Sequence, residues 1–209
     1  MKPTNLFIAA IVAATPLAAH AEPRAAFDVA EDISRFVHAG APVFEDGMPA
    51  YGNAFVTQGY IYPAGALDGG VEGTLPNGDP AFPDLVIGEW TCDGYFIAEG
   101  MRTETGAMVI TRQIYRFDDG DLLVSHGVEL ADPGVTVTRA ITGGTGDYAD
   151  APAAMEQVML GMSKGYGVRL QIQIDDGTSD PVVEERDHTE WDSDARVGPA
   201  SVPERKAEG

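Results

Sequence analysis

The chain has 209 residues, a formal net charge of −20 and one cysteine, Cys92. A charge of this sign and size repels nucleic acid and anionic membranes, so we expect neither as a partner. One cysteine can form no disulfide within the chain, so the apolar core alone must hold the fold.

The first 21 residues have the pattern of a secretory signal peptide. Lys2 precedes an apolar run at 6–14 that is too short to span a bilayer, and the AHA tripeptide at 19–21 fits a cleavage site. We therefore expect cleavage before Glu22 and an exported protein, either periplasmic or secreted. A membrane anchor is the alternative, but no stop-transfer flank follows the apolar run.

Residues 22–53 form an N-terminal extension with one helical candidate. Phe27, Ala30, Ile33 and Phe36 recur at helical spacing, and the sequence then reaches Gly40, a plausible stop. The pattern predicts a short helix that precedes the main domain.

Residues 54–175 contain seven segments of alternating apolar and polar residues, separated by turns. The segments are 54–62, 86–98, 106–117, 122–130, 135–141, 155–162 and 166–174. Such segments with short loops and no helix between them predict an antiparallel sandwich or barrel. We favour an all-β barrel of seven or eight strands, because closure removes exposed strand edges.

Two loops and a tail complete the organisation of the chain. Residues 68–83 are rich in Gly and Pro and form a long loop, either functional or floppy, and 118–121 (DDGD) reads as a hairpin turn. Residues 176–209 carry many charges and few apolar side chains, which predicts a disordered acidic tail.

The glycine-rich stretch at 141–153 (ITGGTGDYADAPA) could be a phosphate cradle or a corner between strands. A phosphate loop needs a helix after its glycines, but Pro152 stands where that helix would propagate, and Asp147 would repel phosphate. We therefore interpret Gly143, Gly144 and Gly146 as a structural corner.

This corner resembles a signature of the allene oxide cyclase and dirigent barrel superfamily. The family joins late strands of an eight-stranded barrel with Gly-Gly-Thr/Ser-Gly-x-Phe-x-x-Ala-x-Gly. The matching residues here are Gly143, Gly144, Thr145, Gly146, Tyr148 (for Phe) and Ala151, while Ala153 replaces the last Gly. The order of the preceding strands also fits, and the resemblance covers about 54–175.

The resemblance implies an exported bacterial barrel, similar to allene oxide cyclases, that holds a small apolar molecule in its lumen. It implies a homo-oligomer, most simply a trimer, and, if there is catalysis, an isomerase that steers cyclisation or coupling. A lipocalin-like carrier without chemistry and a structural module with a solidly packed lumen are the alternatives.

Charged residues in otherwise apolar registers are candidate site residues. His126, Arg139 and Glu156, the candidate catalytic groups, each share a register with aliphatic residues. Arg112, which lies between Ile110 and Ile114, is a candidate ligand-binding residue. If these registers face the lumen, they supply an acid, a base and cations inside an apolar cup. Alternatively, Arg139 and Glu156 form a structural pair across neighbouring strands.

Trp90, Cys92 and Phe96 share one face of their strand and are candidate ligand contacts, whereas Glu89 and Asp93 occupy the opposite face. The resemblance supports Cys92 as a ligand contact, because plant allene oxide cyclases carry a lumen cysteine at a similar sequence distance before the glycine signature. The alternative is that Cys92 is a small buried hydrophobe. The histidines lack the spacing of metal ligands, so we expect no metal and no cofactor.

Overall fold

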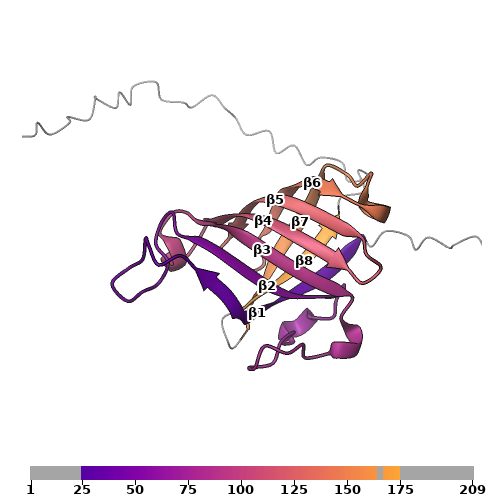
Figure 1. Ribbon diagram of the computed structural model, residues 1–209, viewed down its shortest axis with the longest axis horizontal. Coiled ribbons are helices and arrows are strands. Elements are labelled where there is room, and N and C mark those ends of the chain that lie inside the picture. Colours follow the sequence, from indigo (N-terminus) through magenta and orange to yellow (C-terminus); the bar gives the residue numbers. More distant parts are fainter. Residues whose placement is uncertain (1–24, 164–166, 175–209) are drawn as a thin grey trace, which may run out of the picture. The chain divides into compact units, whose positions relative to one another are not determined.

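The computed structural model describes residues 25–163 and 167–174, and the strands in these ranges close into an antiparallel barrel (Figure 1). The strands are β1 (Ala26–His38), β2 (Ala54–Pro63), β3 (Gly88–Phe96), β4 (Ala107–Phe117), β5 (Leu122–Leu130), β6 (Thr136–Gly144), β7 (Ala154–Met162) and β8 (Val168–Ile174). Each strand pairs with its successor, and β8 pairs with β1 to close the ring. The predicted all-β barrel is confirmed, and β2 to β8 correspond to the seven predicted segments.

Other predictions concern the ends of the chain and the membrane. The predicted signal peptide at 1–21 and the predicted tail at 176–209 lie outside the described residues. Within the described part of the chain, no helix is long and apolar enough to cross a membrane.

The helix predicted at 27–37 is wrong, because this segment is β1, which pairs with both β2 and β8. The barrel therefore begins at Ala26, upstream of the expected boundary at residue 54. The residues from Phe27 to Asp32 are all buried, on both faces of the strand. A strand buried on both faces loses its alternation, and a helix-like spacing of apolar residues can then arise by chance.

The outer face of β1 is buried by the connection between β2 and β3, which contains the short 3-10 turns η1 (Asp68–Gly70) and η2 (Pro83–Leu85). The Leu67 backbone N–H donates to Asp28 Oδ2 at 2.9 Å, and Leu67 packs with Ala30 and Tyr62. The Tyr62 hydroxyl donates to the Gly73 carbonyl at 2.6 Å. This loop therefore covers one side of the barrel wall.

A bulge interrupts the β1–β2 ladder near one end of the barrel. Asp32 pairs with Gln58, but the next paired residue of β1 is Val37, opposite Val56. Phe36 then lies at the mouth of the lumen, where its ring stacks on Phe55 at 5.6 Å between centroids. Val37 faces outward and is 61% exposed.

Aromatic side chains close the opposite end of the lumen. The Phe27 ring contacts Tyr115 and Phe117 edge-on, at centroid distances of 5.0 and 5.4 Å. Tyr148, from the 3-10 turn η4 (Gly146–Tyr148), stacks on Phe117 at 5.0 Å. The end that contains Phe36 and Phe55 carries an apolar pocket.

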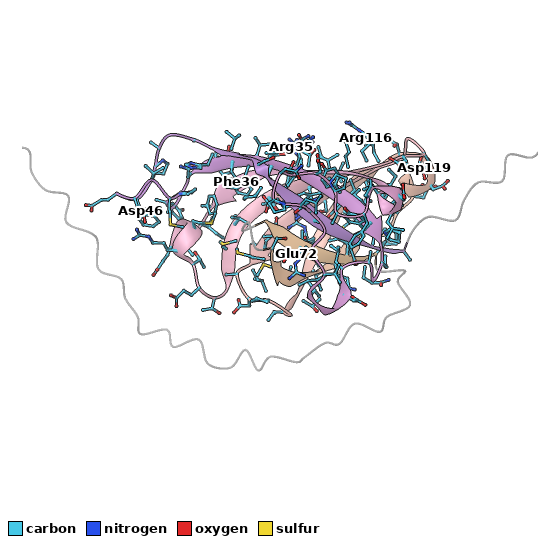
Figure 2. The ribbon with its side chains drawn as sticks, turned by 90° about the horizontal axis from the view of Figure 1, so that it is seen from below. Arg35, Phe36, Asp46, Glu72, Arg116 and Asp119 are labelled. Carbon is cyan, nitrogen blue, oxygen red and sulfur yellow. The ribbon has the colours of Figure 1, made fainter. Side chains whose placement is uncertain are left out.

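Charged side chains surround this barrel on its outer face and in its loops. Arg35 and Arg116 extend from strands β1 and β4, and Glu72 lies in the covering loop (Figure 2). Asp46 and Asp119 lie in connections at opposite ends of the barrel (Figure 2). Charged side chains of both signs therefore lie on the surface.

The glycine-rich stretch forms the corner that follows β6. The Thr145 N–H donates to the Leu122 carbonyl at 2.9 Å, and the Leu122 N–H donates to Thr145 Oγ1 at 3.0 Å. A Cβ atom on Gly144 would overlap the Tyr148 carbonyl, and Gly146 has φ +58° and lies against Asp121. The corner needs glycine at both positions because the backbone passes too close to its neighbours for a side chain.

This close approach predicts different outcomes for two adjacent glycines. Gly144→Ala should lower the free energy of unfolding by roughly 1–3 kcal/mol, because the added methyl forces the corner open. Gly143→Ala is the matched control, since no atom lies within 4 Å of its added Cβ. Urea unfolding measures both, and equal stability of the two variants would contradict a tight corner.

Candidate functional site

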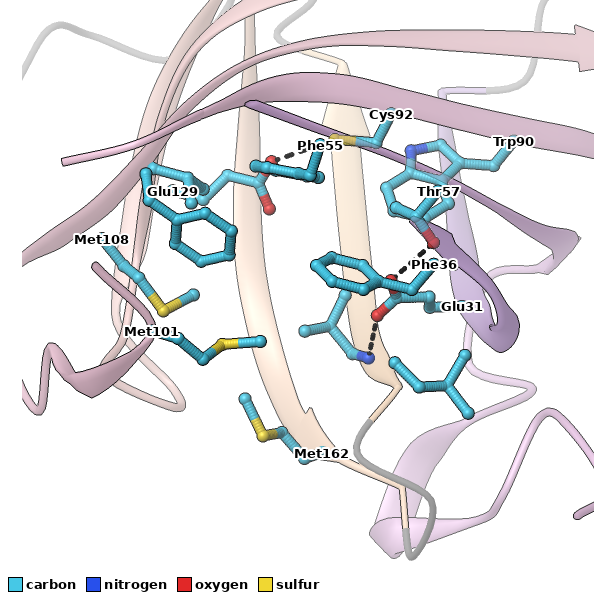
Figure 3. A pocket seen from close by; sticks show the side chains of 14 residues that line it. Glu31, Phe36, Phe55, Thr57, Trp90, Cys92, Met101, Met108, Glu129 and Met162 are labelled. Atoms are coloured by element: carbon cyan, nitrogen blue, oxygen red, sulfur yellow. Dashed lines mark hydrogen bonds between the residues drawn. The ribbon is translucent and has the colours of Figure 1, made fainter. Parts of the chain in front are cut away.

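The candidate site is the pocket at the open end of the lumen, and its walls are mostly apolar (Figure 3). Phe36, Phe55, Trp90 and Phe96 supply aromatic surface. Three methionines, Met101, Met108 and Met162, lie together across the pocket from Glu31 (Figure 3). The cavity has a volume of about 50 Å³, which is enough for a few water molecules.

Glu31 of β1 is a buried carboxylate in the wall of this pocket, and only 4% of its surface is exposed. The Thr57 hydroxyl donates to Glu31 Oε1 at 2.6 Å, and the Val168 N–H donates to Oε2 at 2.8 Å. Burial raises the pKa of Glu31 to about 6; the two hydrogen bonds oppose this shift, while nearby Glu129 and Asp32 add to it. Glu31 can therefore change its protonation state close to neutral pH.

Glu129 of β5 is the second carboxylate of the pocket, and it is held by several donors. Its Oε1 accepts hydrogen bonds from Thr111 Oγ1 at 2.5 Å and from Gln113 Nε2 at 2.8 Å. The Cys92 thiol also donates to this oxygen, at a sulfur–oxygen distance of 3.6 Å. An Arg139 nitrogen lies 3.8 Å from the same oxygen, so Glu129 has a cationic neighbour.

Arg139 of β6 is completely buried beneath the pocket. Its Nε donates to Ser125 Oγ at 3.1 Å, and its Nη1 donates to the Val128 carbonyl at 3.1 Å. Its Nη2 donates to both oxygens of Thr111, at 3.1 and 3.0 Å. The guanidinium thus directs its hydrogen bonds into the barrel wall, which is the arrangement of a structural cation.

Gln113 of β4 connects this charged pair to the rest of the lumen. Its Nε2 donates to Gln157 Oε1 at 3.0 Å as well as to Glu129, and its Oε1 accepts from Trp90 Nε1 at 3.3 Å. The Tyr115 hydroxyl donates to the same Oε1. The middle of the lumen is therefore a continuous polar network that links β3, β4, β5, β6 and β7.

Three of the predicted site residues do not face the lumen. His126 and Glu156 are exposed on the outer faces of β5 and β7, and Arg112 forms an exposed ion pair with Asp93 at 2.8 Å. The prediction assumed that the more apolar register of each strand faces inward. Here the inward registers of β4 and β5 contain polar residues, because they supply the partners of Arg139 and Glu129.

Trp90, Cys92, Phe96 and Arg139 do face the lumen, as the sequence predicted. The first three line the pocket, and burial, aided by the charge of Glu129, raises the pKa of the Cys92 thiol. Their role as ligand contacts stays a prediction. Arg139 and the exposed Glu156 do not form the alternative structural pair, because the carboxylate beside Arg139 belongs to Glu129.

The sequence analysis missed both carboxylates of the pocket. Glu31 lies in the segment that was predicted to be a helix, and Glu129 lies in the register of β5 opposite His126, which the prediction placed outside the lumen. The segment from Leu123 to Glu129 offered one signal, since its alternate residues Ser125 and Gly127 are small and uncharged. Among the described residues, no group of His, Cys, Asp and Glu side chains could hold a metal ion.

No protein-family model matches this sequence, and no curated protein matches it. Solved structures do resemble the barrel. A pterocarpan synthase dirigent protein is 12% identical with a TM-score of 0.52, over 71% of this chain and 90% of that one. A second such protein is 12% identical with a TM-score of 0.49, over 71% and 85% of the two chains. A pyocyanin demethylase is 14% identical with a TM-score of 0.44, over 72% and 98%.

At such low identity the first of these similarities shows the fold alone. The chain has a barrel similar to that of a dirigent protein, which confirms the dirigent part of the sequence resemblance at the level of fold. A closer relation to allene oxide cyclases stays a prediction.

The buried network predicts unequal roles for two arginines. Arg139→Met should lower the free energy of unfolding by about 3–5 kcal/mol, because Glu129 loses its cationic neighbour in a buried site. Arg112→Met, the control on the outer face, should cost less than about 1 kcal/mol, since exposed ion pairs contribute little. Chemical unfolding of both variants tests this; similar losses would show that Arg139 is not a structural centre.

The raised pKa of Glu31 predicts how the free energy of unfolding depends on pH. Its folded pKa of about 6 exceeds the ordinary value of 4.5, so the folded state binds this proton more tightly than the unfolded state. The resulting stabilisation is complete below about pH 4.5 and is lost as the pH rises through about 6, a change of roughly 2 kcal/mol.

Unfolding curves at several pH values should therefore show wild type losing stability relative to Glu31→Gln between pH 4.5 and 7. Glu156→Gln, which changes an exposed carboxylate, should follow the wild-type profile. Parallel profiles for wild type and Glu31→Gln would contradict the assignment.

Proposed function

We propose that this barrel binds a small apolar molecule in the pocket at its open end and steers the cyclisation or coupling of that molecule. The observation that carries the proposal is the pocket itself: apolar walls that surround two buried carboxyls, of which Glu31 has a pKa of about 6. Ligand sites typically combine apolar walls with a few placed polar groups. The fold similarity to a pterocarpan synthase dirigent protein supports the same class of function.

The walls of the pocket can adapt to the shape of a ligand. The cavity of about 50 Å³ is smaller than most organic ligands, so a ligand has to displace side chains at the mouth. Met101, Met108 and Met162 line that mouth, and methionine side chains rearrange readily because they are unbranched and flexible. The aromatic rings of Phe55 and Phe96 then provide a firmer wall behind them.

Glu31 supplies the chemistry that such a function requires. A carboxyl with a pKa of about 6 can donate or accept a proton near neutral pH, which is the range in which general acid–base catalysis is effective. Cyclisation by isomerisation is redox-neutral, so it can proceed by confinement of the reactant and by a proton that Glu31 donates to the reactant and then takes back. Glu31 is accordingly the residue that we assign to the reacting end of the ligand.

Export and assembly form part of this proposal. The signal-like N-terminus supports export, and the sequence resemblance supports a trimer. Apolar side chains on the outer face near the mouth give a trimer a surface to bury: Val37 and Val56 are paired neighbours, as are Tyr95 and Ile110. All four are exposed, by 61, 43, 60 and 39% respectively.

Purification of the protein from its native host, followed by analysis of any compound that it retains, tests the proposed binding. Protein purified from that host should carry a small apolar compound that mass spectrometry detects after extraction. Met162→Trp should lose this compound, because the larger ring fills the mouth. Leu85→Trp is the control, since Leu85 has a similar exposed fraction (46% against 44%) and does not line the pocket.

Loss of the compound from both variants, or from neither, would argue against binding in this pocket. Retention in Leu85→Trp together with loss in Met162→Trp supports it. A compound that emerges from the wild-type barrel chemically unchanged after incubation would favour the carrier over the enzyme.

A further inference from the structure

The hydrogen-bond donors among the pocket side chains are already engaged by the protein. The Thr57 hydroxyl donates to Glu31, the Cys92 thiol donates to Glu129, and the Trp90 indole N–H donates to Gln113. The other side chains that line the pocket, apart from the two glutamates, are aliphatic, aromatic or methionine. The lining therefore has no side-chain donor left for a ligand.

The same lining is rich in acceptors. Glu31 and Glu129 each place a carboxylate in the pocket wall, and a carboxylate has about four acceptor positions. The two hydrogen bonds that Glu31 receives occupy only part of this capacity. A polar group of a ligand must therefore act as a donor if it is to form a hydrogen bond with these side chains.

The charges at the pocket favour a cation. Arg139 lies beside Glu129 and offsets its charge, but the partners of Glu31 are a hydroxyl and a backbone N–H, which are neutral. No ion pair among the described residues includes Glu31. The titratable groups around it are Glu129 on β5, Asp32 on β1 and Cys92 on β3. Arg139 on β6 lies 3.8 Å from Glu129 and Arg35 lies 3.2 Å from Asp32, so of these three carboxylates only Glu31 has no cationic partner in the described part of the chain.

The aromatic walls favour a cation as well. Phe55 lies between Phe36 and Phe96, with ring centroids 5.6 and 5.0 Å away. The faces of such rings attract an ammonium group, most strongly where water is excluded. A carboxylate ligand, by contrast, would meet the two glutamates without a free donor.

We infer that the pocket selects a small apolar molecule that carries a protonated amine, and that Glu31 is the counter-ion of this amine. The inference rests on the proposed function, because it specifies the ligand of the same pocket. An ionised Glu31 pairs with the ammonium group, so binding of a cation weakens as the pH falls through about 6, when Glu31 becomes protonated.

Three probes of similar size test this selectivity: benzylamine, a cation; benzyl alcohol, which is neutral; and benzoate, an anion. Titration calorimetry or ligand-detected NMR gives their affinities at pH 7.5. Benzylamine should bind at least about tenfold more tightly than benzyl alcohol, as expected for a charged hydrogen bond, and benzoate should bind most weakly. Between pH 7.5 and 5 the affinity for benzylamine should fall about tenfold, because a carboxyl with a pKa near 6 is then mostly protonated.

Glu31→Gln identifies the group responsible. This variant should bind benzylamine at least about tenfold more weakly than wild type, while its affinity for benzyl alcohol stays within about twofold. Glu156→Gln removes an exposed carboxylate from β7 and should match wild type with all three probes. If Glu31→Gln does not fold, the pH series on the wild-type protein still decides the question.

The outcomes separate the inference from the proposed function. Equal binding of benzylamine and benzyl alcohol, or preference for benzoate, overturns the cation selectivity but leaves a binding pocket in place. No binding of any probe counts against the pocket itself, and therefore against both. Preference for benzylamine that survives in Glu31→Gln overturns the role of Glu31.

Discussion

The complete burial of the Arg139 guanidinium is the constraint on which the lumen depends. A buried cation has no water to solvate it, so the barrel wall must supply both a compensating charge and hydrogen-bond acceptors. Glu129 supplies the charge, while Ser125 and Thr111 supply acceptors from neighbouring strands. These positions cannot be apolar, so a polar layer lies between the aromatic plug at one end and the apolar pocket at the other.

This polar layer leaves the two pocket carboxylates with different properties. Glu129 is fixed by Arg139 and by several donors, so its environment is that of a structural group. Glu31 lies on β1 among apolar walls, with one hydroxyl and one backbone N–H as partners. Burial without a cation is what raises its pKa to about 6. Because Glu31 has no cation beside it among the described residues, it is the group that we expect to contact a ligand. Its raised pKa therefore affects both the stability of the fold and the chemistry of the site.

The sequence was sufficient to locate β2 to β8, because their alternation and their turns follow from a wall with two different faces. It failed for β1, whose outer face is covered by the loop around Leu67. For the site, the face of β3 was predicted correctly, since Trp90 and Cys92 alternate with the charged Glu89 and Asp93. In β5 the prediction placed the apolar register that contains His126 in the lumen. The small residues Ser125 and Gly127 were a weak signal against this choice, and the partners that Arg139 needs on the inner face become clear only from the structure.

Because of the bulge in β1, the number of residues between Asp32 and Val37 cannot change without changing the structure of the mouth. Side chains of a strand alternate between its faces, so the number of residues in the bulge determines which of them point inward beyond it. With the present length, Phe36 lies in the mouth of the lumen and Val37 outside. Loss or gain of one residue here would exchange the two faces, placing Val37 at the mouth and removing an aromatic wall from the pocket. Natural variants of this barrel should therefore tolerate substitutions in the bulge far better than single-residue insertions or deletions.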